Sequence, residues 1–580
     1  MAKLGDNADG VHVFSGRSDI TNEPDAEEWI KARGREVQQL RSIPTWKHVK
    51  LKVLQKLGIK PTRTMFVDRV KRTDKNKIEE FKSRGVACQF NAVAGRDYVD
   101  KFWHVARDSS INSTLAKGTQ KGVKLYQIDL PAFYLQADPK DANFEHEKSN
   151  IIYISMLPGY AEKDDDGDEA AGVLTAAMYG TAIAGRAAGR KLSKDFTDFG
   201  LSRGSYDHAV YRMEKDGKWI EICCIVDDMV VADYGDSLIF ELRDYLQQRW
   251  GSGRRMSDGT PGKPIKFSSL AWCLGRTVRV NTDLGIVMVT GAQYIEDMQK
   301  KYMTPEAEAI VEKFKADVPC DKVIAELSTV APRQLPDAAS VTRSLVQSLA
   351  YAAHKFKNEI LYAVGRLQRF ADKPCDGVYT CALQVLKYCI RDKEYGTAWS
   401  RSDDDATLKY SDDAEPYVSV DSSWQVHDKA LRSRSTTGMI FFWKDGPISV
   451  RSIGQKFQAI TSTDAESHGI ASAMYEGIVI RGHLMETGVV FTKPTRLEND
   501  NSGGVLVARD AASMHHSRAT AMRAVFCQEC VEQGMYDPVH VPAEKMTADI
   551  LTKWLPLNDF AKHRAKLTNR RAQSKMLELK

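Results

Sequence analysis

The chain has 580 residues, of which 43% are hydrophobic and 27% are charged, with a formal net charge of +5 at pH 7. These values predict a globular protein of about three or four domains, and the charge is too small to indicate nucleic-acid binding by itself. The 10 cysteines show no disulfide framework, which favours a reducing compartment. Because the N-terminus lacks an apolar signal segment and no run has membrane-spanning length, we expect a cytoplasmic or nuclear protein.

The first elements in chain order are a polar segment and a helix. Residues 1–27 are polar and are predicted to be disordered. A helix is predicted over residues 28–40, where apolar side chains recur at helical spacing. Those side chains are Trp29, Ala32, Val37 and Leu40.

A basic hairpin is predicted next, over residues 64–92, with Lys82 and Arg84 on its returning strand. An apolar strand over 123–130 follows and carries Asp129 near its end. The stretch 170–191 is rich in alanine and glycine and is predicted to be helical.

Two successive hairpins are predicted between residues 209 and 232. Asp216-Gly217 is a strong turn signal for the first, and the second reverses at Asp227-Asp228. Ser237 is predicted to cap the helix that follows. Five apolar residues repeat at helical spacing along it: Leu238, Ile239, Leu242, Leu246 and Trp250.

The second half of the chain is predicted to contain a helical region and then a new α/β unit. The helical region covers residues 292–392, and an acidic linker follows over 401–415. The basic residues of 561–580 are predicted to form a solvated tail, with phosphate contact as the alternative. The α/β unit is predicted to contain strands at 417–420 and 495–499, a hairpin at 438–450, and helices at 464–487 and 519–533.

Asp227 and Asp228 lie between two apolar runs, so two adjacent carboxylates are expected in a largely buried hairpin. Such a pair is costly to bury unless a divalent cation balances it, and a solvated turn is the alternative. If the strand of Asp129 pairs with this hairpin, three carboxylates could bind two magnesium ions roughly 3.5–4 Å apart and support nucleotidyl transfer. Lys82 and Arg84 could then contact a triphosphate.

A second set of acids occurs in the C-terminal α/β unit. Four carboxylates near the ends of separate elements could bind two metal ions for phosphodiester hydrolysis. The alternative is that they are ordinary exposed acids at the ends of strands and helices. They are Asp421, Glu466, Asp500 and Asp549.

The order of these motifs resembles the reverse transcriptase and ribonuclease H region of Pol from copia-type long-terminal-repeat retrotransposons. The similarity is collinear from about Glu28 to Leu555. The segments that carry it include 127–137, 206–211, 225–228, 420–424, 461–466, 500–503 and 548–553.

The resemblance implies an α+β multidomain fold. A right-hand polymerase would have fingers and palm over 28–270 and a mainly helical thumb and connection over 271–410. A ribonuclease H-like domain would cover 411–560. The implied partners are an RNA template, a DNA primer, an RNA–DNA hybrid and dNTPs, and the implied location is a cytoplasmic virus-like particle or the nucleus. The chain would then be part of a larger polyprotein of a DNA-integrating element, or a stand-alone relic of one.

The resemblance also implies roles for individual residues. Asp129, Asp227 and Asp228 would bind two Mg²⁺ ions, with Mn²⁺ as a substitute. Lys82 and Arg84 would contact the triphosphate, and Tyr134 would discriminate against a ribose 2'-hydroxyl. The remaining four acids would bind two further metal ions that activate water against the RNA strand: Asp421, Glu466, Asp500 and Asp549.

Several positions depart from the family pattern, among them Phe133 in place of a small residue and residues 519–523 in place of a Thr-Lys-His-Ile-Asp segment. Ile183 stands where the family has a glutamine that helps to hold the nucleotide, and Ile225 replaces a tyrosine before the aspartate pair. Ser423 replaces an acid in the segment after Asp421. These departures leave open an alternative, a weakened or co-opted remnant that binds nucleic acid or a partner without turnover.

Overall fold

The computed structural model describes most of the chain in fourteen ranges. None of the helices in them is both long and apolar enough to cross a membrane. Of the segment 1–27 predicted to be disordered, residues 1–24 fall outside these ranges, whereas Ala26 and Glu27 belong to the first helix. The predicted hairpin turn at 74–76 and the linker residues 402–414 also fall outside them. The described ranges are 25–72, 78–142, 151–164, 166–253, 256, 259–327, 339–372, 374, 376–401, 415–425, 428, 432–456, 458–510 and 518–579.

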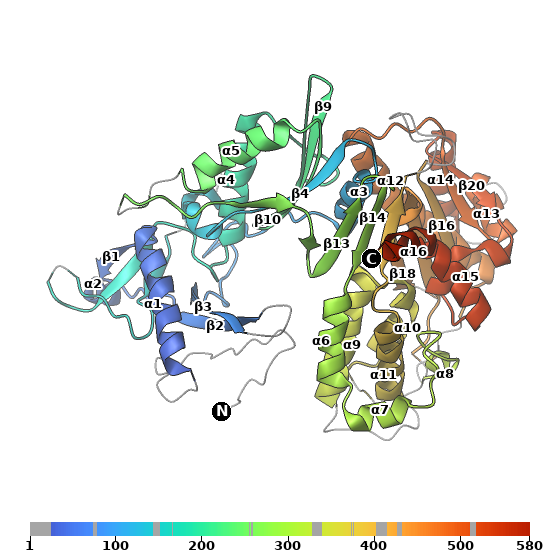
Figure 1. The fold of residues 1–580 in the computed structure, drawn as a ribbon, viewed down its shortest axis with the longest axis horizontal. Coiled ribbons are helices and arrows are strands. Elements are labelled where there is room, and N and C mark those ends of the chain that lie inside the picture. The colour runs from blue at the N-terminus through green and yellow to red at the C-terminus, as the bar shows by residue number, and fades with distance from the viewer. Residues whose placement is uncertain are drawn as a thin grey trace.

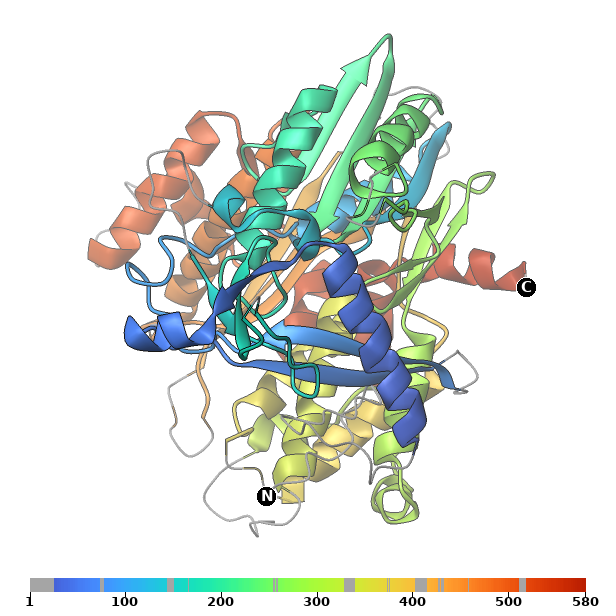
Figure 2. The same ribbon diagram turned by 90° about the vertical axis from the view of Figure 1, so that its left-hand side faces the viewer.

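The N-terminal part contains a helix packed on a hairpin. Helix α1 (Ala26–Ser42) lies across strands β2 (Thr64–Arg72) and β3 (Ile78–Ala87), which pair antiparallel (Figure 2). The side chains predicted to form the buried face of this helix are buried. Arg33 and Asp68 form a buried ion pair at 2.6 Å between helix and hairpin, which fixes α1 on strand β2 of the hairpin.

The segment predicted to be one helix over 170–191 forms a strand and then a helix. Strand β6 (Ala170–Leu174) is the centre of a sheet, between β1 (Trp46–Lys50) and β5 (Tyr153–Ser155), and helix α4 (Ala184–Phe199) begins later. A Cβ at Gly172 would lie 3.1 Å from atoms of Ile154 and Trp46. The small side chains of β6 therefore allow close packing in the sheet. The pairing of β6 with β1 and β5 overrides the helix propensity of this alanine-rich segment. Helix α2 (Leu51–Lys56) follows β1.

The central sheet has six antiparallel strands and contains both predicted hairpins. Successive residues of its strand β4 point to opposite faces. Gly118, after helix α3 (Asp108–Lys117), packs on Leu125, whereas Phe240 of helix α5 (Leu238–Trp250) contacts Tyr126. The sheet is thus covered on both faces. Its order is β11 (Lys266–Ser269), β4 (Val123–Asp129), β10 (Asp228–Tyr234), β9 (Lys218–Ile225), β8 (Val210–Lys215) and β7 (Ser202–Arg203).

The expected cap of α5 differs in the structure. Ser237 occupies the N-cap position, but its side chain accepts no capping hydrogen bond. Instead Asp233 accepts a hydrogen bond from the backbone N–H of Ile239 at 3.2 Å, and the Ser237 hydroxyl accepts one from Lys218 at 3.1 Å. An aspartate four residues earlier satisfies the helix terminus, because the preceding turn brings it back over the first N–H groups.

A helical region and a small antiparallel sheet follow. The sheet has the order β12 (Trp272–Cys273), β13 (Arg276–Asn281), β14 (Ile286–Thr290) and β15 (Thr397–Ser400). The predicted core residues of the helices, from Leu345 to Leu367, are buried. The helices are α6 (Ala292–Tyr302), α7 (Pro305–Val311), α8 (Val323–Glu326), α9 (Ala339–Lys355), α10 (Leu361–Gln368) and α11 (Asp376–Arg391).

The C-terminal unit is a five-stranded mixed sheet with helices. Its strand order is β18 (Gly446–Gly454), β17 (Thr436–Trp443), β16 (Tyr417–Ser423), β19 (Thr495–Asn499) and β20 (Tyr536–His540). Strand β19 runs parallel to β16 and to β20, and the other pairs are antiparallel. The helices are α12 (Ser462–Glu486), α13 (Ser502–Arg509) and α14 (Arg518–Glu532). Figure 1 shows this mixed α/β unit beside the helical region.

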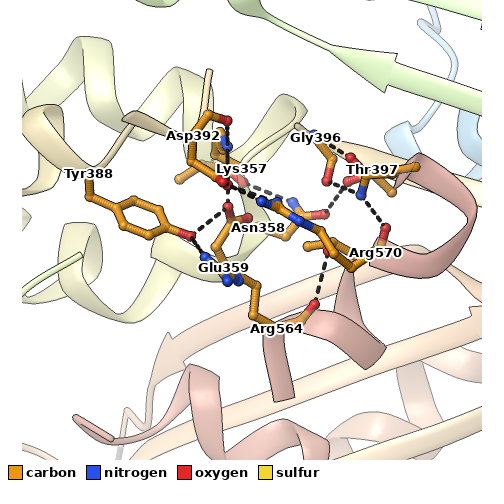
Figure 3. Close-up of polar contacts among 12 residues, drawn as sticks. Lys357, Asn358, Glu359, Tyr388, Asp392, Gly396, Thr397, Arg564 and Arg570 are labelled. Atoms are coloured by element: carbon orange, nitrogen blue, oxygen red, sulfur yellow. Dashed lines mark hydrogen bonds and ion pairs between the residues drawn. The ribbon is translucent and has the colours of Figure 1, made fainter. Parts of the chain in front are cut away.

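The predicted solvated tail at 561–580 is wrong, because helices α15 (Leu557–Leu567) and α16 (Arg570–Glu578) pack on the helical region (Figure 3). Arg570 and Lys357 both contact the Asp392 carboxylate, at 2.9 and 3.0 Å. The buried Gln573 side chain exchanges two hydrogen bonds with the backbone of Gly396. Arg570 of this segment thus neutralises an internal acid.

Helix α3 also joins the central sheet to the C-terminal unit. Buried Lys117 pairs with Glu221 of β9 and donates to the Thr487 carbonyl at 2.9 Å. Ser113 bonds His483 of α12 at 2.9 Å. Removing one partner of such a buried ion pair costs about 3–5 kcal/mol, so this joint holds the two units in one arrangement.

Candidate functional site

The hairpin predicted to reverse at Asp227-Asp228 turns one residue earlier, so Asp227 lies in the turn and Asp228 begins β10. Ile225 pairs with Asp228, so Val226 and Asp227 form a two-residue turn. Val226 has φ 63°, which is unfavourable for a β-branched residue and costs about 1–3 kcal/mol. The strained turn directs the aspartates toward the neighbouring strand, where Asp129 is the register partner of Asp228.

These three carboxylates influence one another but do not form a tight cluster. Burial, followed by repulsion from Asp129, raises the pKa of Asp227. Burial, followed by repulsion from Asp227, raises the pKa of Asp228. The Lys266 ammonium lies 2.7 Å from the Asp129 carboxylate and balances part of the negative charge.

A cavity of about 380 Å³ opens at this point between the hairpin β2–β3, helix α1 and the central sheet. Asp129 and Asp227 line it together with Lys82 and Arg84 of β3. The basic strand therefore faces the aspartates across one cavity, which can accommodate an anionic ligand beside a cation. Lys263 and Lys266 also line the cavity. The sequence did not predict this, because each lysine stands in it only as an isolated positive charge.

Tyr134 lies on the short helix η1 (Tyr134–Gln136) after Asp129. Its ring contacts Tyr179 edge-on at 5.3 Å, and the Arg84 guanidinium lies 5.0 Å from the Tyr179 ring centre. Burial and then the charge of Asp227 raise the pKa of Tyr134. This aromatic pair links Arg84 to the aspartates. Tyr179 falls within a segment that resembles a family motif, but the sequence predicted no role for it.

The acids of the C-terminal unit come together more closely. Carboxylate oxygens of Asp421, Asp500 and Asp549 lie within 4.8 Å of one another, and no other trio of potential metal ligands does so within the described ranges. Asp421 and Asp500 come from the carboxyl ends of parallel strands β16 and β19. Asp549 lies on the short helix η7 (Thr547–Leu551), and Asp421 and Asp549 are almost fully buried.

A glycine lets η7 approach the sheet. Gly438 is the register partner of Asp421 on β17. A Cβ at this position would lie 2.7 Å from the Leu551 side chain and 2.9 Å from the Ala548 carbonyl. The absence of a side chain at Gly438 therefore brings Asp549 to the other acids.

Glu466 borders the trio from the start of α12. Its carboxylate accepts hydrogen bonds from the Ser422 backbone at 3.2 Å and from Asn499 at 2.9 Å. Burial, followed by repulsion from Asp421, raises its pKa to about 9. The same causes raise the pKa of Asp549 to about 7, against the opposing effect of Lys553. The fold thus buries these acids and places them so close together that, without a cation, Glu466 and Asp549 resist ionisation.

The chemistry of this trio fits a divalent metal ion. Hard carboxylate oxygens are the preferred ligands of Mg²⁺. The Oδ1 atom of Asp549 is buried and has no hydrogen-bond partner, whereas its Oδ2 atom pairs with Lys553 at 2.9 Å. A buried carboxylate oxygen without a donor is costly, and a bound cation at the trio would satisfy it.

Several neighbours of the C-terminal acids were missed in the sequence. Thr552 donates to Asp421, and His540 bonds the backbone carbonyl of Asp500 at 3.1 Å. Lys553 and Asn499 contact the acids directly. Thr552 and Lys553 fall within a motif segment, whereas His540 is brought near by the parallel pairing of β20.

Three of the departures from the family pattern, at Ile183, Ile225 and Ser423, have structural roles here. Ile183 is almost fully buried before helix α4, and Ile225 is a buried strand residue beside the hairpin turn. The hydroxyl of Ser423 accepts a hydrogen bond from the Thr436 backbone at 3.3 Å. Each is accommodated by the packing around it.

Comparisons with known proteins agree over most of the chain. Residues 44–305 match the family described as reverse transcriptase (RNA-dependent DNA polymerase). The chain is 25% identical to the retrovirus-related Pol polyprotein from transposon RE1 of Arabidopsis thaliana, over 93% of this chain and 34% of that protein. It is 23% identical to the corresponding polyprotein from transposon TNT 1-94 of Nicotiana tabacum, over 93% of this chain and 38% of that protein.

The chain therefore spans about a third of the length of these relatives. One similar solved structure is that of the foamy viral protease-reverse transcriptase dRH in complex with double-stranded DNA. It has 11% sequence identity and a TM-score of 0.40, and the match covers 90% of this chain and 70% of that one. Taken together, the reverse transcriptase match and the Pol relatives support the predicted resemblance of this chain to the Pol polyproteins of copia-type retrotransposons.

Proposed function

We propose that the protein is an RNA-directed DNA polymerase linked to a ribonuclease H. In this proposal residues 28–270 are fingers and palm, 271–410 are thumb and connection, and 411–560 are the ribonuclease H-like domain. The observation that carries the polymerase assignment is the cavity in which Asp129 and Asp227 face Lys82 and Arg84, within the matched reverse transcriptase segment.

In the polymerase, Asp129, Asp227 and Asp228 would hold two Mg²⁺ ions, which activate the primer 3'-hydroxyl and stabilise the leaving pyrophosphate. Lys82 and Arg84 would bind the triphosphate of the incoming dNTP, because they face the aspartates across the cavity. Tyr134 would border the sugar, next to the aspartates and braced by Tyr179.

In the ribonuclease H, the trio of Asp421, Asp500 and Asp549 would hold two metal ions with Glu466. Their charge would favour the ionised form of Glu466, whose hydrogen bonds to Ser422 and Asn499 already orient it. The substrate would be the RNA strand of an RNA–DNA hybrid, gripped mainly through its backbone and A-like shape.

The direct test is primer extension on a poly-rA template with an oligo-dT primer, with and without Mg²⁺. We expect Mg²⁺-dependent incorporation of dTTP by the full chain, and loss of incorporation when the metal is chelated. A folded wild-type protein that binds the primed template but never extends it would overturn the polymerase assignment and favour the remnant without turnover.

The ribonuclease assignment has a separate test. Hybrid cleavage should require Mg²⁺ and should release fragments of the RNA strand only. Persistence of an intact RNA strand under conditions in which the polymerase extends its primer would overturn this half of the proposal.

A further inference from the structure

A second, larger cavity lies between helix α10 and the C-terminal sheet, where Figure 1 shows α10 beside β18. Its volume is about 660 Å³. Helix α10 and the residue after it contribute Arg366 and Arg369, and the end of β18 is followed by Gln455 and Lys456. Of the described residues that line this cavity, none carries a carboxylate.

The cavity has a strongly positive wall. Arg369 donates to the Arg432 carbonyl at 3.2 Å and to the Thr436 hydroxyl at 3.0 Å. Arg434 donates to the Lys456 carbonyl at 3.2 Å. These acceptors are neutral, so they orient the guanidinium groups without cancelling their charge. Burial and the neighbouring Arg366 and Arg434 lower the pKa of Arg369 to about 10.

Like charges held together at a half-buried surface favour an anionic ligand. Arg369 lines the cavity and presents planar donors suited to phosphate, and Lys456 adds an exposed point charge. The nearby His468 adds little charge, because burial lowers its pKa. The cationic side chains thus define one end of the cavity.

The neutral side chain of Gln455 also lines the cavity and lacks, among the described residues, a hydrogen-bond donor for its oxygen. Gln455 is 3% exposed, and its Nε2 atom donates to the Thr437 hydroxyl and the Ala465 carbonyl, each at 3.0 Å. Its Oε1 atom is buried and has no hydrogen-bond donor. A hydroxyl on the ligand would supply this donor, so phosphate alone does not satisfy the cavity.

The cavity lies next to the C-terminal acids. Ala465, whose carbonyl binds Gln455, precedes Glu466 on α12. Thr436, which binds Arg369, is the register partner of Ser423, two residues after Asp421. A strand of nucleic acid held in the cavity would therefore approach the carboxylate cluster from α10.

We propose that this cavity binds the sugar–phosphate backbone of the RNA strand of a hybrid. A phosphate would contact Arg369 and Lys456, and a ribose 2'-hydroxyl, which DNA lacks, would donate to Gln455. Helix α10 would then help to set where the RNA strand enters the carboxylate cluster. This inference rests on the proposed ribonuclease H function and assigns the substrate contact to residues outside its acids.

The test uses the full chain and a short RNA–DNA hybrid, with binding followed by fluorescence anisotropy in EDTA. Lys456→Glu should weaken binding about tenfold and reduce the slope of log affinity against log salt by about 1 or more. Lys456 is exposed, so the variant should fold. The matched control is Lys575→Glu on α16, also exposed, which should bind as the wild type does.

Two further arms identify the ligand. An all-DNA duplex of the same sequence should bind the wild type more weakly than the hybrid, and Gln455→Met, which keeps the side-chain length but removes the acceptor oxygen, should reduce that difference. Inorganic phosphate at millimolar concentration should not displace the hybrid. If phosphate displaced the hybrid, and this displacement required Lys456, the cavity would be a simple anion site. That result would overturn the sugar–phosphate assignment.

The outcomes separate the cavity from the proposed function. A wild type that cleaves the hybrid in Mg²⁺, with equal binding by the Lys456→Glu and Lys575→Glu variants, would overturn the cavity alone. A wild type whose hybrid binding depends on Lys456 but which never cleaves would overturn the ribonuclease assignment and leave the binding site standing.

Discussion

The two carboxylate clusters balance their charges in different ways. In the central sheet, Lys266 pairs with Asp129 at 2.7 Å, and the three acids stay apart. In the C-terminal unit, the trio lies within 4.8 Å, with Lys553 bound to one oxygen of Asp549. The first cluster holds a protein cation where a metal could bind, whereas the second is already arranged for one. Under the proposed function, metal binding at Asp129 would require Lys266 to move, whereas the carboxylates of the C-terminal trio already lie close enough together to share a metal ion.

The largest expected effect is on polymerisation. Replacing Asp227 with Asn should reduce primer extension about 10³-fold, because a metal-binding charge is lost at the reacting phosphate. Hybrid cleavage should be unchanged. Asp216→Asn, at the tip of the neighbouring hairpin, is the matched control and should leave extension intact. Loss of both activities in the Asp227 variant would point to misfolding.

A smaller effect is expected on sugar selectivity. Tyr134→Ala should admit ribonucleotides, lowering the preference for dNTPs over rNTPs about tenfold as the aromatic wall is removed. Tyr134→Phe keeps the ring against Tyr179 and should retain the preference. Single-nucleotide incorporation with matched dNTP and rNTP measures the ratio, and an unchanged ratio in the Ala variant would reject the role of Tyr134.

The ion pair at Asp129 gives a prediction about metal concentration. Lys266→Ala should lower the Mg²⁺ concentration for half-maximal extension about two- to fivefold, because a competing ammonium worth up to about 1 kcal/mol is removed. Lys263→Ala is the control, since Lys263 lines the same cavity but binds Gln39. The Mg²⁺ requirement of hybrid cleavage should not change. An unaltered Mg²⁺ titration for extension would contradict the contrast between the clusters.

The smallest effect concerns stability and pH in the metal-free protein. Burial and Asp421 raise the folded pKa of Glu466 to about 9, well above its unfolded value of about 4.3. The folded state therefore binds more protons than the unfolded state. The stability that protonated Glu466 contributes is fully present below about pH 4 and is lost as pH rises through the folded pKa.

Glu466→Gln removes this titration. In EDTA the variant should melt at about the same temperature as the wild type at pH 5 and roughly 2 °C higher at pH 9. Differential scanning calorimetry measures both, and Mg²⁺ should stabilise the wild type more than the variant. A wild type that gains stability between pH 5 and 9 in EDTA relative to the variant would reverse the sign and refute the account.

The local patterns predict much of each cluster. The turn signal at Asp216-Gly217 and the apolar runs on both sides of Asp227-Asp228 predict the hairpins, and the register of Asp228 with Asp129 follows once β4 and β10 pair. The pairing of Lys266 with Asp129 is not predictable locally, because β11 is a short edge strand after an irregular loop. The tertiary contacts of β6 and of Arg570 are likewise long-range, so composition suggests a helix and a tail where the fold makes a strand and a buried ion pair.

The account rests on two separate active sites in one chain, and Glu466→Gln tests that separation most directly. Extension and hybrid cleavage are measured on one preparation of this variant, with Glu476→Gln on the same helix as the matched control. We predict that Glu466→Gln loses cleavage about 10³-fold and keeps extension at the wild-type level, whereas the control keeps both. Cleavage at the wild-type rate by the Glu466 variant, or equal loss of both activities in a folded protein, would contradict the account.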